Sequence, residues 1–358
     1  MKKTLLTICW IFLMLVPATG QSTDQTIDDV MERTVSDFVR PGYEAFGNST
    51  SEMSETVERL CKAPGQETLQ SARAAFTATA KSWADIELIR FGPISRENRF
   101  ERILFYPDRK STGLKQVQRI LAKQDDSATD LNRITGKSVA VQGLGALEFL
   151  LFGTGSEMLV SGDKFRCSYA ATVSQNLAKI ASILIDGWQA NGDATKTWTV
   201  PGPDNPVLRS PKEAVNELLG TLVHGLESIR DLRIGAFLRK ETSKDRPRVA
   251  IFRRSENTMT MIAANIAAIK RLLLQSGAQS LLSPEDGPIF DNIIFELENA
   301  ERVANAIPEP LGNSITEPEH RDRLVYLRTS VGFAIGMLDQ DFAAAAGLSS
   351  GFSFSDGD

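Results

Sequence analysis

Apolar residues recur along this chain in steps of three and four positions, and this spacing restricts the fold more than any other feature of the sequence. In the segment 69–86 such residues form one stripe along a helix. Gly92 and Pro93 then interrupt the pattern, so we predict a helix of about six turns that ends before them. The stripe consists of Leu69, Ala72, Phe76, Trp83 and Ile86.

Similar periodicity predicts helices through most of the chain, whereas the alternation typical of β-strands is nearly absent. The composition is that of an ordinary globular protein, with 42% hydrophobic and 24% charged residues. We therefore predict an all-α fold whose helices pack as bundles. The further helical segments are 27–38, 114–121, 171–188, 214–229, 259–274, 289–307 and 321–346.

A break in composition at 191–211 separates two helical halves, because this segment carries four prolines and two glycines and lacks helical periodicity. Ser210 and Pro211 at its end are typical of a helix cap and a first helical turn. The predicted organisation is a signal peptide at 1–20, an N-terminal helical bundle at 21–190, a linker at 191–211, and a C-terminal bundle with a tail at 212–358.

The N-terminus has the features of a secretory signal. Lys2 and Lys3 precede an apolar stretch at 5–16, and small residues follow around Ala18. About twelve apolar residues are too few to span a bilayer, which needs roughly twenty. We therefore predict an exported protein without a transmembrane segment in its mature chain.

The mature chain is acidic and retains two cysteines. Without Lys2 and Lys3 the 40 basic residues fall to 38 against 45 acidic ones, a net charge of −7, which disfavours a nucleic-acid partner. The remaining cysteines are Cys61 and Cys167. In an exported protein such a pair is typically joined in a disulfide. Two separate buried thiols are the alternative.

One acid, Glu148, lies in the otherwise apolar run VQGLGALEFLLFG. On a helix its neighbours three and four positions away are leucine, glycine and phenylalanine. A carboxyl group on such a face is protonated, paired with a base, or bound to a cation. Gly143 and Gly145 cost helix stability, but they let another backbone or a ligand come close.

A second pair of charges, Glu87 and Arg90, extends the face of the predicted helix that carries Trp83. If Glu87 and Glu148 met between helices, they would form an oxygen site suited to a divalent or ferric cation. The alternative is an ion-pair network in which Arg90 neutralises one or both acids, and this network requires no ligand.

The sequence gives little support for catalysis. The only histidines, His224 and His320, do not belong to a zinc-peptidase spacing. His224 lies within a predicted helix and is typical of a core or boundary residue, and His320 is typical of a solvated helix start. No nucleophile elbow, phosphate-binding loop or dinucleotide fingerprint is present.

Five blocks of sequence, in their order and spacing, resemble the imelysin-like proteins of bacterial cell envelopes. They are LCKAPGQETLQSARAAFTATAKSWADIELIRFGP, QGLGALEFLLFG, FRCSYA around Cys167, FRRSEN at 252–257, and the ending GLSSGFSFSDGD. The resemblance spans nearly the whole mature chain. It implies two up-and-down bundles of the four-helix type packed together, with a site near their junction. It also implies a disulfide between Cys61 and Cys167. The tail that carries Asp356 and Asp358 matches the family's closing residues, so an ordered tail and the flexible, solvated tail that composition favours both stay open.

The hallmark of this family is the motif G-x-H-x-x-E, and its glycine and acid match Gly143 and Glu148. Gly145 stands at the histidine position, so this chain resembles a branch of the family that lacks the nitrogen ligand of the motif. A family block with tryptophan, an acid and FGP places Glu87 near the same site. The family was first described as peptidases, and other members resemble iron-uptake proteins.

Together, the residues and the resemblance predict a periplasmic binding protein. We expect a ligand site at Gly143, Gly145, Glu148 and Arg90, with Glu87 and Glu148 as metal ligands. The expected ligand is iron, another divalent cation or a small organic molecule, and the expected partners are envelope iron-uptake proteins. Two alternatives are an envelope metallopeptidase and a non-catalytic structural module in which Glu148 and Arg90 pin the bundles together.

Overall fold

The computed structural model describes residues 24–348. Helices and loops make up this part of the chain, and it contains no β-strand, which confirms the predicted all-α class. Within the same range no helix is both long enough and apolar enough to span a bilayer. The signal peptide predicted at 1–20 and the tail acids Asp356 and Asp358 lie outside the described residues.

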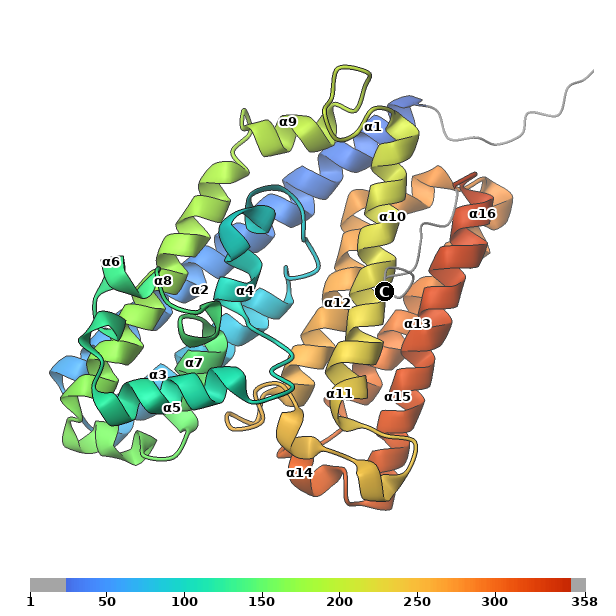
Figure 1. The fold of residues 1–358 in the computed structure, drawn as a ribbon. Helices are drawn as coiled ribbons and strands as arrows, with labels where there is room; N and C mark the ends of the chain where they lie inside the picture. The colour runs from blue at the N-terminus through green and yellow to red at the C-terminus, as the bar shows by residue number, and fades with distance from the viewer. Residues whose placement is uncertain (1–23, 349–358) are drawn as a thin grey trace, which may run out of the picture.

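The bundle of the first half consists of three long helices and one short one, namely α2 (Arg40–Lys62), α3 (Gln66–Ala84), α8 (Lys164–Gly187) and the short α7 (Leu144–Phe152). The other helices of this half are α4 (Arg99–Ile103), α5 (Thr112–Lys123) and α6 (Leu131–Ile134). Helix α2 packs against α3 and α8, and the short α7 closes the ring by packing against both of them (Figure 1). Helix α5 lies across the outer side of α7.

The second half is an up-and-down bundle of four long helices. They are α10 (Pro211–Glu227), α12 (Thr258–Ser276), α13 (Gly287–Asn305) and α15 (Pro318–Gly336). Each packs against the next, and α15 returns to α10 (Figure 1). Short helices connect or end them, namely α11 (Gly235–Phe237), α14 (Leu311–Ser314) and α16 (Ala343–Ala345).

One continuous helix joins the two halves. It runs through α1 (Asp24–Arg33), the π-helical turn η1 (Thr34–Val39) and α2. Helix α1 packs against α10 and α12, so the described part of the chain begins beside the second bundle and enters the first along α2 (Figure 1). The sequence predicted a helix only at 27–38. The helix instead continues through Pro41, which lies just after the π-helical turn.

The segment predicted as a linker contains a short helix, α9 (Asp193–Thr199). Trp198 on this helix is buried and stacks on Phe91, with ring centroids 3.3 Å apart. This tertiary contact orders a segment whose residues show no helical periodicity. Ser210 caps α10 by accepting a hydrogen bond from the Glu213 amide, as the sequence predicted. The buried apolar side chains form one cluster through both halves.

Candidate functional site

Glu148 is sequestered in the middle of α7. This helix is apolar on all faces, and every residue from 146 to 151 is buried. The side chain of Glu148 lies among them with 4% of its surface exposed. The sequence-based expectation of a buried acid is confirmed at this position.

Backbone and side-chain groups from the second half bind the Glu148 carboxylate. Its Oε1 accepts hydrogen bonds from the amides of Arg254, at 2.8 Å, and Ser255, at 3.1 Å, and from the Ser255 hydroxyl at 3.2 Å. The Arg254 guanidinium lies 3.6 Å from Oε2. Burial raises the pKa of Glu148 above the ordinary value, while the Arg254 charge and these hydrogen bonds oppose the rise.

A cavity of about 320 Å³ opens beside Glu148 at the junction of the two halves. Its walls come from α5, from α7, from the loop before α5 and from the segment 248–254. Phe252, in this last segment, has a positive φ of 48°, a conformation that is costly for a bulky residue. The charged residues that line the cavity are Asp108, Glu148, Arg248, Arg253 and Arg254.

The two glycines of the motif have different surroundings. A Cβ atom at Gly143 would lie 2.3 Å from the Arg102 carbonyl oxygen, so Gly143 permits a close backbone approach. Gly143 is buried. A Cβ atom at Gly145 would meet nothing within 4 Å. Gly145 is exposed and lines the cavity with Glu148, so the family's histidine position faces open space.

Glu87 forms a separate buried ion pair with Arg233. The Arg233 Nη2 atom lies 2.7 Å from Oε1 and 2.8 Å from Oε2 of Glu87. Arg233 belongs to the π-helical segment η6 (Ser228–Ile234) and stacks its guanidinium over the Tyr106 ring at 4.7 Å. Arg90, the base proposed from the sequence, lies over the Phe100 ring at 4.3 Å. Burial lowers the pKa of Arg90, and the charge of Glu87 opposes that change.

Glu87 and Glu148 therefore have different partners and line different hollows. The hollow at Glu87 holds only about 10 Å³, room for about one water molecule. In residues 24–348 no three side chains of His, Cys, Asp or Glu are grouped to hold a metal ion. Glu148, with glycine at the histidine position and three donors on one oxygen, does not fit a resident metal ion.

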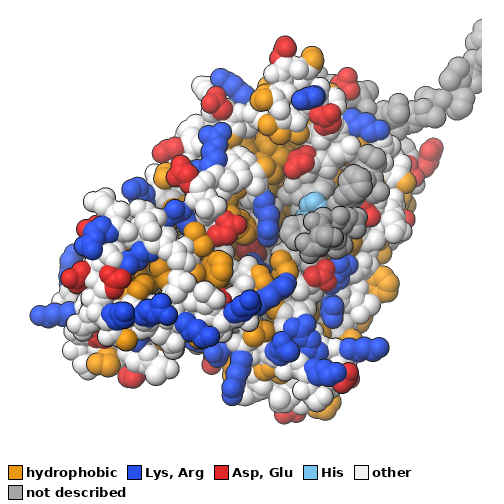
Figure 2. All heavy atoms as spheres, viewed as in Figure 1, with side chains coloured by type: hydrophobic (Ala, Val, Ile, Leu, Met, Phe, Trp, Pro, Cys, Tyr) orange, Lys and Arg blue, Asp and Glu red, His pale blue; other side chains and the backbone are white. Residues whose placement is uncertain are grey.

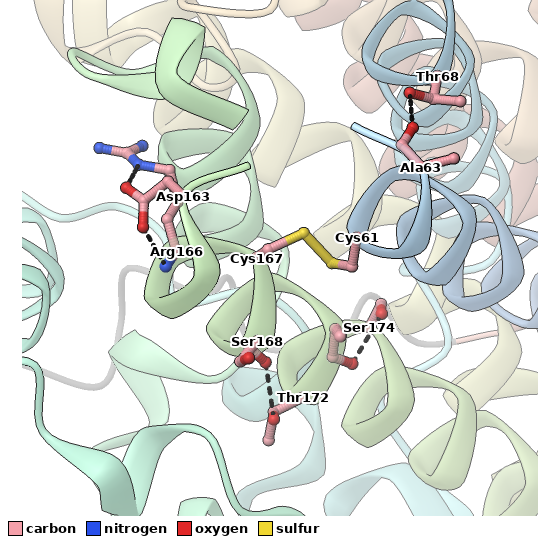
Figure 3. The surroundings of a disulfide bond; sticks show 10 residues. Cys61, Ala63, Thr68, Asp163, Arg166, Cys167, Ser168, Thr172 and Ser174 are labelled. Atoms are coloured by element: carbon pink, nitrogen blue, oxygen red, sulfur yellow. Dashed lines mark hydrogen bonds and ion pairs between the residues drawn. A yellow bond between two sulfur atoms is a disulfide. The ribbon is translucent and has the colours of Figure 1, made fainter. Parts of the chain in front are cut away.

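A disulfide joins α2 to α8, and the arginine next to it binds the end of α7. Cys61 at the end of α2 and Cys167 near the start of α8 form the disulfide, with Cα atoms 5.5 Å apart (Figure 3). The pairing expected from sequence is confirmed. The adjacent Arg166 donates hydrogen bonds to the carbonyls of Leu150 and Thr154, at 3.0 and 2.7 Å. These bonds satisfy backbone acceptors at the C-terminal end of α7.

Three residues of the site were not identified from the sequence. Arg254 and Ser255 lie in the block FRRSEN, so their position in a specific block was the available signal. Arg233 has no such signal, because it lies on a helical segment far from Glu87 in the chain. Only the packing of the halves brings it to Glu87.

Comparisons with known proteins agree with this architecture. The family model for imelysin matches residues 39–332, which is most of the chain. The chain is a member of the imelysin family. An imelysin-like protein from Psychrobacter arcticum 273-4 has a similar fold, with a TM-score of 0.76 and 18% identity over 94% of this chain and 100% of that one. The search of curated proteins gives no match.

A second solved structure shares the imelysin fold. It comes from Parabacteroides distasonis ATCC 8503 and is described as a "putative iron-regulated protein A precursor". Its TM-score is 0.74, with 15% identity over 91% of this chain and 97% of that one. In this chain neither His224 nor His320 lines the cavity at Glu148. These residues therefore do not replace the imidazole that the motif lacks.

Proposed function

We propose that this imelysin-family protein is a non-catalytic binding protein of the bacterial periplasm that holds a small molecule in the cavity beside Glu148. The cavity itself is the observation that carries the proposal. Its volume of about 320 Å³ lies within the usual range for small-molecule sites. It lies at the junction of the two halves, and Gly145 leaves one wall open.

A connection with iron supply is part of the proposal, and the relative described as iron-regulated supports it. That description concerns regulation, so it does not require the protein to bind a bare iron ion. The Glu148 donor set does not favour such an ion, because Arg254 and Ser255 already occupy the carboxylate. The ligand proposed here is therefore a small molecule.

Gly145 offers a direct test of the cavity. In Gly145→Phe the ring would fill the cavity, whereas Gly145→Ala would add one methyl group in open space. Each variant and the wild-type protein would be isolated from the native compartment and measured by native mass spectrometry. We expect a non-covalent ligand mass on the wild-type protein and on Gly145→Ala, and none on Gly145→Phe. A bound mass that persists in Gly145→Phe, or a wild-type protein without one, would contradict the proposal.

A structural role is a second candidate function, and the contacts of Glu148 favour it. This carboxylate ties α7 to the segment 254–255 of the other half. Under this alternative the cavity has no occupant. A native mass equal to that of its own bare chain, in each of the three proteins, would support it.

A further inference from the structure

The cavity beside Glu148 has an excess of positive charge. Arg248, Arg253 and Arg254 line it, against two carboxylates, Asp108 and Glu148. The wall thus carries one more positive than negative side chain. This local excess contrasts with the acidic balance of the whole chain.

Both carboxylates of the cavity already have partners within the protein. The Asp108 oxygens accept hydrogen bonds from the amides of Thr112, Gly113 and Leu114 at 2.7, 2.9 and 3.3 Å. These amides form the start of α5, so Asp108 caps that helix. Glu148 Oε1 has three donors, and Arg254 faces its other oxygen. The acids of the cavity are therefore used by the protein itself.

Arg253 differs from these carboxylates because its charged group is not used by the protein. It is half-buried, and within residues 24–348 its guanidinium has no hydrogen bond or ion pair. Burial lowers the pKa of Arg253, and the positive charges of Arg254 and Arg248 lower it further, while Glu148 opposes them. A guanidinium has five N–H donors. Arg253 therefore brings unused donors to a place where positive charges already repel one another.

Another part of the cavity wall is apolar. Phe105, Leu114, Val117 and Phe149 come from α5, α7 and the loop between α4 and α5. A row of Lys and Arg side chains crosses the seam between the two halves, with hydrophobic side chains beside it (Figure 2). One side of the cavity thus suits a charged group, and the other suits a hydrocarbon or an aromatic ring.

We propose that the cavity binds a small organic anion whose carboxylate or phosphate lies against Arg253 and Arg248 and whose apolar body lies against α5 and α7. This inference rests on the proposed binding function and names the chemical class of the ligand. Arg254 remains with Glu148, and Arg253 supplies the unpaired donors. A planar guanidinium binds either oxyanion through two parallel hydrogen bonds.

Matched probes test the charge of the ligand. Decanoate and decyl phosphate share an apolar chain with decanol and differ from it in charge. Isothermal titration calorimetry on the ligand-stripped protein should show that at least one of the two anions binds tenfold or more tightly than decanol, and the tighter anion identifies the headgroup. Citrate carries charge without an apolar body, so we expect it to bind more weakly than decanoate.

Arg253→Ala is the decisive variant. Because Arg253 makes no bond within the described chain, its loss should leave the unfolding midpoint unchanged. We expect it to weaken binding of the tighter anion about tenfold, the effect of losing one charge-assisted contact. It should leave decanol binding unchanged. Arg209→Ala, at an exposed arginine that does not line the cavity, is the control and should bind the anions normally.

The inference is overturned if decanol binds as tightly as both anions, or if Arg253→Ala binds them as the Arg209→Ala control does. Gly145→Phe separates this failure from failure of the proposed function. When one of these two failures is observed and Gly145→Phe also abolishes binding of decanol and of the anions, the cavity is a binding site without charge selectivity. If no probe binds, or if Gly145→Phe has no effect, both the inference and the binding function fail.

Discussion

Glu87 and Glu148 are both buried glutamates at the junction of the two halves, and different groups of the protein balance their negative charges. Glu87 meets one arginine side chain through both oxygens, with almost no free space around it. Glu148 meets two backbone amides and a hydroxyl, with its arginine farther away and a cavity beside it. The first arrangement joins two helices, and the second leaves cationic groups available next to a space that a ligand can occupy.

The largest effect is expected at the Glu87 pair. Glu87→Leu would leave Arg233 charged and buried without a partner, and breaking a buried pair in this way costs about 3–5 kcal/mol. Urea denaturation followed by circular dichroism measures the loss. The double variant with Arg233→Met should recover most of it, because apolar residues can replace a whole buried pair. A double variant as unstable as Glu87→Leu alone would show that the pair is not the source of the loss.

The next largest loss of stability is expected at Gly143, which sets the position of α7 beside the cavity. Gly143→Ala would force a methyl group against the carbonyls of Arg102 and Ile103, and overpacking of this kind costs about 1–3 kcal/mol. Gly145→Ala, two positions along, should cost nothing because its Cβ meets open space. Thermal unfolding of the two variants checks the contrast. Equal stabilities would mean that the close approach at Gly143 does not constrain the helix.

Glu148→Gln should change how stability depends on pH. The pKa of Glu148 in the folded chain is raised above its ordinary value of 4.5, so between these two pKa values the unfolded chain releases a proton that the folded chain keeps. The free energy of unfolding that Glu148 contributes therefore falls as the pH rises through this window, with a limiting slope of about 1.4 kcal/mol per pH unit.

Glutamine does not titrate and keeps an Oε1 acceptor. The stability of Glu148→Gln relative to wild type should therefore increase from acidic to neutral pH and then level off. Urea denaturation at a series of pH values measures the difference between the two proteins. A difference that is constant with pH, or that changes in the opposite direction, would refute the raised pKa.

The smallest effect is expected from restoring the family motif. Gly145→His would place an imidazole three positions before Glu148, on the same helical face and in open space. The partners of Glu148 remain in place, so we expect zinc to bind Gly145→His no more tightly than wild type. Thermal unfolding with and without zinc measures this. A stabilisation by zinc that is seen in Gly145→His and lost in Gly145→His combined with Glu148→Gln would show that the carboxylate is free to bind a metal ion.

Most of the helical architecture was predictable from local patterns. The stripes that predicted helices at 69–86 and 259–274 fall within or largely within α3 and α12, because these helices bury one continuous face each. Helix α2 was missed in its main part because Pro41 and a polar stretch around Ser51 disguise its buried face. Helix α9 was missed because contacts with α1, α8 and Phe91 order a segment that lacks helical periodicity. Both misses reflect tertiary packing that outweighs local signals.

The site was predictable only in part. Glu148 was identified because a carboxylate in an apolar run needs a partner, and this argument is local. Its partners Arg254 and Ser255, and Arg233 for Glu87, lie more than a hundred positions away in the chain. No periodicity relates residues across such a distance. The assignment of Glu87 and Glu148 as metal ligands stays a prediction, and the arginine partners of both acids do not favour it.

The long helix from Asp24 to Lys62 limits how the cavity can change shape. It belongs to both bundles, and its π-helical turn lies within a continuous helix. A helix shared in this way opposes a hinge motion of the two halves. Movement of the cavity wall would instead come from the short stretch 248–256, where Phe252 and Glu256 hold costly backbone angles. Adjustment to a ligand would thus be confined to one loop, while the two bundles keep their relative positions.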